Sequence, residues 1–320
     1  MKILAIQNRM GIGDMVIFLP FIEAIAKKFN TRVSILAKEN SKISHFIKNN
    51  KYIGQIIYLE RNNKKNRHDG FFGTITLIKE LKNHNFDKAF IFNSSLRFNI
   101  IAKIAGIKKV YQYPLFEKKN QHIIDAAKKF LKKEIDLDVD SNPKIILDEN
   151  DVKEAQKNFN INVNQKNILL GIGGSGETKR IPPEIILKFM EMSVAHYSDC
   201  NFFLATGQNE KEQIILNEIL NSKFKERCVA LDKMRLEDIL PIIKNCNIAI
   251  CNDSSFSHLS AALQVETIVL MSDTPLVYGN YSSKMHPIIP DGETTVTHDT
   301  HGKNKINPEK IFQKFKKLLN

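Results

Sequence analysis

Short apolar runs alternate with segments of helical hydrophobic period along almost the whole chain of 320 residues. Apolar strands separated by helices are typical of β-α-β units, in which helices cover both faces of a parallel sheet. The alternation therefore predicts an α/β protein with parallel sheets. Strands are expected over 2–7, 32–38, 55–59, 88–93 and 108–113 in the first half, and over 167–172, 201–206, 229–231, 248–253 and 267–272 in the second.

Two such series of strands indicate two doubly wound domains, and the chain is long enough for two cores. A polar stretch that contains Pro143 separates the series. The boundary is expected between Asp136 and Gln165, with a first domain over 1–160 and a second over 161–305. A basic helix over 306–320 is expected to pack back on the first domain.

Positive charge is concentrated in the first half of the chain. Residues 1–160 hold 29 Lys and Arg against 17 Asp and Glu, whereas residues 161–320 hold 18 of each kind. Lysines that merely solvate helix surfaces would explain this excess. A polyanionic partner would explain it equally well, whether a phosphorylated acceptor, an anionic membrane surface or a nucleic acid.

Composition narrows the class of protein. Apolar residues make up 42% of the chain and charged residues 26%, which is ordinary for a soluble globular protein. No apolar run approaches the roughly 20 residues of a membrane span, and a strand begins at Lys2, so we expect no signal peptide. The four cysteines form no CxxC pair, which favours free thiols in a reducing cytosol over a zinc site.

One expected strand of the second half ends directly in polar residues. Asn252, Asp253, Ser254 and Ser255 lead into a helix of small residues, and free N–H groups at a helix N-terminus favour an anion. His258 follows one turn later and can share a face with the serines. This cluster fits a phosphate and a ribose, and a capping box with an incidental histidine is the alternative. A Ser-His-Asp hydrolase is disfavoured, because the GxSxG elbow is absent.

A glycine-rich loop follows the expected strand over 167–172. Its letters contain GxGxxG, but a polar stretch and two prolines precede the next helix, unlike a dinucleotide-binding turn. It is not a P-loop, because Glu177 stands where that motif needs lysine. The loop either cradles a diphosphate or is a plain connection. The residues that would contact the diphosphate are Gly173, Gly174, Ser175, Thr178 and Lys179.

Two acids follow other expected strands. Gly11 and Gly13 allow a ligand to approach the backbone before the first helix, and Asp14 would lie at the ligand-binding edge of the sheet. A plain capping acid is the alternative for Asp14. Glu210 follows the second strand of the second domain, where an acid can bond ribose hydroxyls. It is equally well explained as a first-turn acid favoured by the helix dipole.

No metal site and no bound cofactor are expected. Asp136, Asp138 and Asp140 have the spacing of a DxD motif, but they lack a further ligand and are interpreted as a solvated acidic stretch. His298 and His301 lie in loop sequence without a nearby cysteine pair, and we expect them at the surface.

Five segments stand in a characteristic order along the chain: Ile3 to Pro20, Phe86 to Arg97, Ala105 to Val110, Gly173 to Pro182 and Asn252 to Leu263. Together they resemble glycosyltransferase family 9, the lipopolysaccharide heptosyltransferases and their relatives. The resemblance implies a GT-B fold, in which two Rossmann-like domains face a central cleft and bind the acceptor and the donor nucleotide respectively. It implies an inverting, metal-independent transfer of heptose from an ADP-activated donor to a growing lipopolysaccharide core.

On this basis we expect Asp14 to act as the general base and Lys179 to stabilise the departing diphosphate. A basic first domain would bind the anionic acceptor. The expected donor-binding residues are Gly173, Gly174, Ser175, Thr178, Lys179, Glu210, Asp253, Ser254, Ser255 and His258, and the expected acceptor-binding residues are Arg9, Gly13, Asn93, Ser95 and Arg97.

Two rival functions remain open. One is a sugar-nucleotide epimerase or hydrolase of the same fold, and the other is a nucleotide- or nucleic-acid-binding module without chemistry. No recognition helix, RNA motif or tryptophan is present, so we expect no nucleic-acid partner. The expected partners are a nucleotide sugar and an anionic lipid-linked glycan. The expected location is the cytoplasm, peripheral to the inner face of the cytoplasmic membrane.

Overall fold

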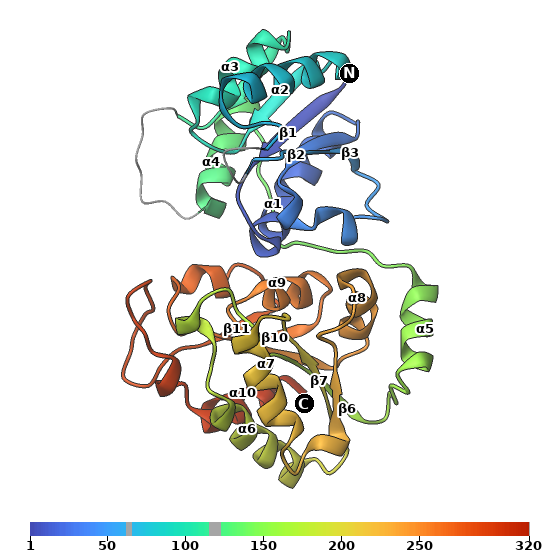
Figure 1. Cartoon of the computed structure of the whole chain (residues 1–320), viewed down its shortest axis with the longest axis vertical. Helices are drawn as coiled ribbons and strands as arrows, with labels where there is room; N and C mark the ends of the chain where they lie inside the picture. Colours follow the sequence, from blue (N-terminus) through green and yellow to red (C-terminus); the bar gives the residue numbers. More distant parts are fainter. Residues whose placement is uncertain (62–65, 115–122, 320) are drawn as a thin grey trace. The chain divides into compact units, whose positions relative to one another are not determined.

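The computed structural model describes residues 1–61, 66–114 and 123–319 (Figure 1). The chain divides into two compact units, Met1–Pro143 and Lys144–Asn320. Each unit contains one sheet whose paired strands are parallel, with helices packed on it. The predicted α/β class with two doubly wound domains is confirmed.

The sheet of the first unit has the strand order β3-β2-β1-β4-β5. The strand order reverses between β1 and β4, and such a switch point is where open α/β sheets bind ligands. All five strands expected in the first half are present. They are β1 Ile3–Gln7, β2 Val33–Ala37, β3 Ile53–Tyr58, β4 Lys88–Ile91 and β5 Lys109–Gln112.

Four helices cover this sheet in the described part of the unit. Leu77 of α2 and Phe98 of α3 share a core cluster with Leu4 of β1, so these two helices cover one face. On the other side, Phe18 of α1 and Phe130 of α4 pack against Phe92, with ring centroids 5.2 and 5.5 Å from it. The helices are α1 Ile12–Lys28, α2 Gly70–His84, α3 Leu96–Ile104 and α4 Ile123–Ile135.

The sheet of the second unit has the order β11-β10-β9-β6-β7-β8, and its switch point lies between β6 and β9. The sequence did not predict β11. This edge strand is short and contains Pro287, which weakens the sequence signal for a strand. The strands are β6 Lys166–Gly171, β7 Cys200–Ala205, β8 Cys228–Ala230, β9 Ile248–Asn252, β10 Glu266–Leu270 and β11 Met285–Ile288.

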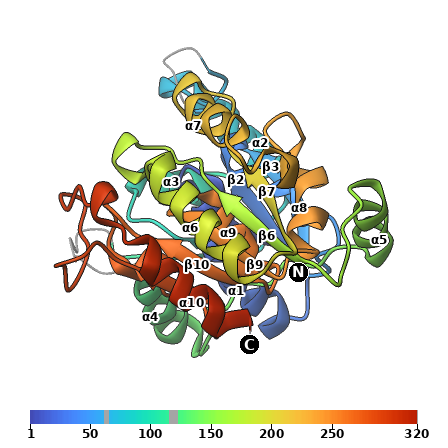
Figure 2. The same ribbon diagram turned by 90° about the horizontal axis from the view of Figure 1, so that it is seen from below.

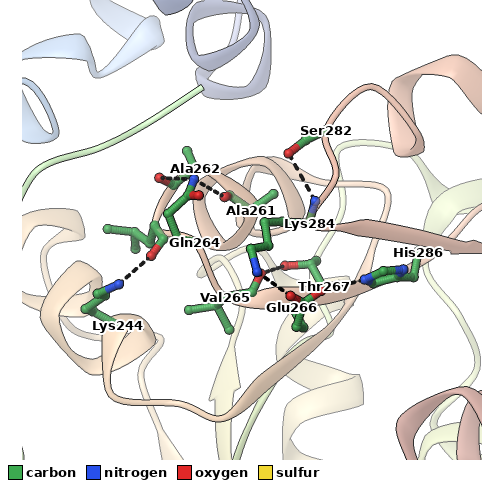
Figure 3. Close-up of polar contacts among 11 residues, drawn as sticks. Lys244, Ala261, Ala262, Gln264, Val265, Glu266, Thr267, Ser282, Lys284 and His286 are labelled. Atoms are coloured by element: carbon green, nitrogen blue, oxygen red, sulfur yellow. Dashed lines mark hydrogen bonds and ion pairs between the residues drawn. The ribbon is translucent and has the colours of Figure 1, made fainter. Parts of the chain in front are cut away.

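Polar contacts hold β11 to the amino end of β10 (Figure 3). The Glu266 carboxylate accepts hydrogen bonds from Lys284 Nζ and from His286 Nε2, the latter at 2.6 Å. Burial acts to raise the pKa of Glu266, but the bonds from Lys284 and His286 lower it below its usual value. Charged side chains therefore attach an edge strand that its own sequence specifies weakly.

Six α-helices belong to the second unit in the residues that the structure describes. The β6, β7, β9 and β10 strands contribute to a large core cluster together with α6, α7 and α10. Figure 2 shows α6 and α10 side by side beneath the sheet. The helices are α5 Glu149–Asn158, α6 Pro183–His196, α7 Glu210–Leu220, α8 Leu236–Lys244, α9 Ser255–Ala262 and α10 Pro308–Leu319.

Two expectations about the domains are corrected. The boundary lies after Pro143, within the expected stretch but earlier than 160/161, because α5 packs on α8 and Asn245 Nδ2 donates to the Val152 carbonyl at 2.9 Å. The C-terminal helix belongs to the second unit, because Phe315 of α10 is fully buried against Phe189 of α6 with ring centroids 5.4 Å apart. The helical period showed that each helix has an apolar face, but not which partner that face meets.

The cysteines are free thiols, as expected. Burial raises the pKa of Cys200 and of Cys228 to about 12, so neither is a reactive thiolate at neutral pH. Among the residues that the structure describes, no helix is long and apolar enough to cross a membrane.

Candidate functional site

The two polar motifs of the second unit meet at its switch point. Strands β6 and β9 are neighbours in register, with Gly171 opposite Cys251, so the segments that follow them leave the same edge of the sheet. Asn252 Nδ2 donates to the carbonyls of Ile172 and Gly173 at 2.8 and 3.2 Å and ties the segments together. The glycine-rich loop and the polar start of α9 therefore form one site.

An ion pair joins these motifs. Lys179 Nζ lies 2.8 Å from Asp253 Oδ2, and the Asp253 side chain is 5% exposed while that of Lys179 is 24% exposed. Burial acts to raise the pKa of Asp253, but the neighbouring Lys179 ammonium outweighs it and the pKa is lowered. Asp253 thus stays ionised and fixes the lysine ammonium at the edge of the sheet.

The N-terminus of α9 lies directly beside this pair. Its N-cap residue, Ser254, makes no side-chain capping bond, and its buried Oγ has no hydrogen-bond partner among the described residues. The first N–H groups of a helix need acceptors, and a phosphate supplies them. An uncapped helix end next to a lysine favours anion binding over the capping-box alternative.

His258 of α9 is buried next to the ion pair and contacts Tyr281. Its Nδ1 lies 2.9 Å from the Tyr281 hydroxyl, and the two rings are stacked with centroids 5.6 Å apart. Burial lowers the pKa of His258 to about 4, so its imidazole is neutral at pH 7. Tyr281 was not expected at the site, because it lies in a segment without recognisable motif.

The acid that contacts the glycine-rich loop is Glu212 and not Glu210. Glu210 is exposed at the start of α7, whereas the buried Glu212 accepts a hydrogen bond from the Gly174 amide at 2.6 Å. A Cβ atom at Gly173 would lie 2.7 Å from Glu212 Oε1, so the glycine makes room for this carboxylate. Glu212 was not singled out from the sequence, although it is the second acid after β7, two residues beyond Glu210. The ribose contact expected of Glu210 stays a prediction.

Further bonds hold the loop in place. Ser272 Oγ donates to the Thr178 carbonyl at 2.8 Å, and Arg180 Nη1 donates to the Gly174 carbonyl at 2.9 Å. Ser175 is exposed at the tip of the loop. The backbone of the loop is thus fixed from both ends, while its serine faces solvent.

The switch point of the first unit gathers another set of expected residues. Gly11, with φ of 107°, precedes α1 and places Asp14 in its first turn. Arg9 Nη1 lies 3.8 Å from Asp14 Oδ1, and the Asp14 side chain is 23% exposed. Asn93, which follows β4, donates from Nδ2 to Asn8 Oδ1 at 3.0 Å and links the two strand ends.

A pocket of about 580 Å³ opens beside these residues. It combines aromatic rings, which can stack on sugar rings, with cations that can pair with anionic substituents. Sequence reasoning missed its contributions from β5 and α4, which carry no motif. The lining residues that matter here are Arg9, Asn93, Phe92, Tyr113, Phe130, Lys129 and Lys133.

Arg97 is engaged within the fold. Its Nη2 donates to the His68 carbonyl at 2.7 Å, and burial together with Arg61 lowers its pKa. Arg97 is not among the lining residues of the pocket, and neither are Gly13 and Ser95. Their part in acceptor binding stays a prediction.

The acidic stretch is solvated, as expected. Asp136 and Asp138 are 85% and 84% exposed, and both lie 2.8 Å from Lys132 Nζ. His298 and His301 are exposed. Within the described ranges, no group of three or more His, Cys, Asp or Glu side chains is arranged to hold a metal ion.

Comparisons with known proteins agree on the fold. The chain is 22% identical to Lipopolysaccharide heptosyltransferase 1 of Campylobacter coli, over 94% of this chain and 92% of that protein. The E. coli ADP-heptose lps heptosyltransferase II structure matches with a TM-score of 0.73 and 17% identity, over 100% and 98% of the two chains. E. coli heptosyltransferase WaaC with ADP matches with a TM-score of 0.74 and 14% identity, over 99% and 100%.

These structural matches confirm the GT-B fold. The family model "Glycosyltransferase family 9 (heptosyltransferase)" matches residues 74–306, which span part of the first unit and most of the second. Because this match covers well over half of the sequence, the chain belongs to glycosyltransferase family 9 and is a glycosyltransferase.

Proposed function

We propose that this protein transfers a heptose from an ADP-activated donor to a lipopolysaccharide or lipooligosaccharide core, with inversion and without a metal ion. The observation that carries the proposal is the Lys179–Asp253 pair beside the uncapped start of α9. The Campylobacter relative is named for lipopolysaccharide, and an E. coli neighbour is named for ADP-heptose.

In this proposal the donor diphosphate lies against the glycine-rich loop and the start of α9. The Lys179 ammonium and the N–H groups of Ser254 and Ser255 stabilise the charge that develops as the diphosphate departs. The unpartnered Ser254 Oγ contributes a further hydrogen bond. Gly173, Gly174, Ser175, Thr178 and His258 shape the site, and Glu210 bonds a ribose hydroxyl.

On the acceptor side, Asp14 takes the proton of the attacking hydroxyl. The acceptor oxygen then bonds to the anomeric carbon from the face opposite the diphosphate, and the bond to the diphosphate breaks, which inverts the configuration. Arg9, Lys129 and Lys133 give the neighbouring pocket the positive charge that an anionic glycan needs. Because such an acceptor is lipid-linked, we place the protein at the cytoplasmic face of the membrane.

Thermal unfolding with ADP, UDP, GDP and CMP tests the donor class. A ligand present at a hundred times its Kd stabilises the native state by about 2.7 kcal/mol, and we expect ADP to give the largest shift. Lys179→Ala should abolish most of the ADP shift. Lys188→Ala, which removes an exposed lysine of α6, is the control and should keep it. A larger shift with UDP, or an unchanged shift in Lys179→Ala, would contradict the proposed donor site.

Asp14→Asn tests the base. We expect turnover to fall by about 10²- to 10⁴-fold, since the amide cannot accept the proton, while the thermal shift with ADP stays as in the wild type. The exposed Glu39→Gln variant in the same unit is the control. Equal turnover in Asp14→Asn would remove Asp14 from this role. Donor turnover that does not need an acceptor would favour the hydrolase or epimerase instead.

A further inference from the structure

Five large apolar side chains are exposed on two helices of the first unit. Phe71 and Phe72, in the first turn of α2, are 75% and 82% exposed, and their rings meet edge to face with centroids 5.9 Å apart. Leu96, Ile100 and Ile104 of α3 are 51%, 44% and 60% exposed. Residues four apart lie on one face of a helix, so these three form a stripe. The five residues are called the α2–α3 patch.

The two helices lie next to each other on the same face of the sheet (Figure 1). The Arg97–His68 hydrogen bond joins the start of α3 to the residues just before α2. The opposite sides of both helices supply the core, for example Leu77 of α2 and Phe98 of α3. The α2–α3 patch is therefore surplus to the packing of the unit, and exposed patches of this kind mark interaction sites.

Two exposed lysines lie next to the α2–α3 patch, while the nearby Asp69 and Glu80 are paired with Arg61 and Arg67. Lys103 is exposed on α3 between Ile100 and Ile104, and Lys79 is exposed on α2 seven residues after Phe72, on the same face. Residues 88–114, which include all of α3, contain no Asp or Glu. The unit as a whole, residues 1–143, holds 26 Lys and Arg against 13 Asp and Glu.

Exposed aromatic and aliphatic side chains flanked by lysines match the chemistry of an anionic lipid surface. Apolar side chains enter the boundary between headgroups and acyl chains, and each nearby lysine adds electrostatic attraction to anionic headgroups. The described part of the second unit offers no such combination: its exposed Ile146, Val163 and Ile214 lie in separate segments. Residues 144–320 hold 21 Lys and Arg against 22 Asp and Glu.

We propose that the α2–α3 patch docks the protein reversibly on an anionic bilayer. Phe71 and Phe72 enter the interface, the α3 stripe lies along it, and Lys79 and Lys103 pair with headgroup phosphates. The proposal deepens the proposed function and depends on it only for its purpose, which is to bring the enzyme to a lipid-linked acceptor.

Sedimentation of the full-length protein with vesicles tests the docking surface. Vesicles that contain phosphatidylglycerol should bind the wild type, and pure phosphatidylcholine vesicles should bind it weakly. Phe71→Ser with Phe72→Ser should lower the partition coefficient about tenfold or more, and Ile100→Ser with Ile104→Ser should lower it in the same direction. Lys103→Glu should weaken binding to the anionic vesicles alone. The matched control, Val163→Ser with Ile214→Ser, should bind like the wild type.

Because every replaced side chain is exposed, the variants should unfold at the wild-type temperature. Their transfer to a detergent-solubilised acceptor should equal that of the wild type. Wild-type binding by the Phe71 and Phe72 double variant would overturn the proposal. So would a lipid-free wild-type dimer that this variant converts to a monomer, since a second copy would then be the occupant. Vesicle binding is measured without substrate, so an enzyme that fails to transfer heptose would leave this result intact.

Discussion

At the scale of single residues, the site of the second unit depends on charges that are costly to bury. The Asp253 carboxylate is 5% exposed and relies on Lys179, and removal of one partner of such a pair leaves the other charge unpaired. Glu212 likewise places a carboxylate under the glycine-rich loop. These carboxylates fix the positions of the Lys179 ammonium and of the Gly174 amide. Apolar side chains of similar size would make the folded state equally stable, so stability does not explain the buried charges.

The burial of His258 should make the folding stability of the protein depend on pH in the acid range. Burial lowers its pKa from 6.5 to about 4 in the folded state, so the unfolded chain binds the additional proton between these values. Stability supplied by the neutral imidazole is complete above pH 6.5 and is lost as the pH falls toward 4. The loss amounts to about 3 kcal/mol.

We therefore expect His258→Gln to flatten the dependence of Tm on pH between 6.5 and 4, measured by calorimetry on the full chain. His298→Gln, at an exposed position, should keep the wild-type slope. A His258→Gln profile that parallels the wild type would show that this imidazole does not titrate as its burial implies.

At the scale of elements, α10 shows how an amphipathic helix finds its partner. Its buried residues Ile311, Phe312 and Phe315 complete the core beneath β9 and β10, against α6. Sequence periodicity predicts an apolar face of this kind, and several sheets or helices can cover such a face. Only packing volumes in the assembled core select one of them.

Phe315→Ala should destabilise the second unit by about 3–5 kcal/mol, because it removes a fully buried ring and leaves a cavity beside Phe189. Lys317→Ala, on the exposed side of the same helix, should change stability by less than about 0.5 kcal/mol. Urea unfolding of the full chain, followed by a probe in the second unit, measures both. A Phe315→Ala value as small as that of Lys317→Ala would contradict the assignment of α10 to this core.

At the scale of the whole molecule, the chain has two cores and a division after Pro143. The second unit includes α5, which packs on α8, and it contains every residue proposed above for donor binding. A unit that has its own hydrophobic core and contains the whole proposed nucleotide site should fold and bind the nucleotide without the other unit.

A fragment that spans residues 144–320 should therefore fold cooperatively and should show a thermal shift with ADP. A fragment that begins at 161 lacks α5 and exposes its packing surface on α8, so it should melt at a lower temperature. Equal melting temperatures for the two fragments would place the boundary at 160/161 after all.

Much of the architecture could be predicted because a buried parallel strand is recognisable from its own segment of sequence. It is an apolar run that ends in glycine or polar residues. The same local signal marked Asp14, Lys179 and Asp253, since ligand-binding residues follow strand ends in open α/β sheets. The edge strand β11 was not predicted, because Pro287 and His286 interrupt its apolar pattern. Its position is fixed in part by a hydrogen bond from His286 to Glu266 of β10.

The sequence by itself determined the strands other than β11, the two-sheet organisation and the strand-end motifs, because each depends on neighbours within one segment. Tertiary structure decided the pairing of Lys179 with Asp253, the contact of Glu212 with the glycine-rich loop and the partners of α5 and α10. These contacts join residues far apart in the chain. Their energies depend on burial and on distances that exist only once the sheets have assembled.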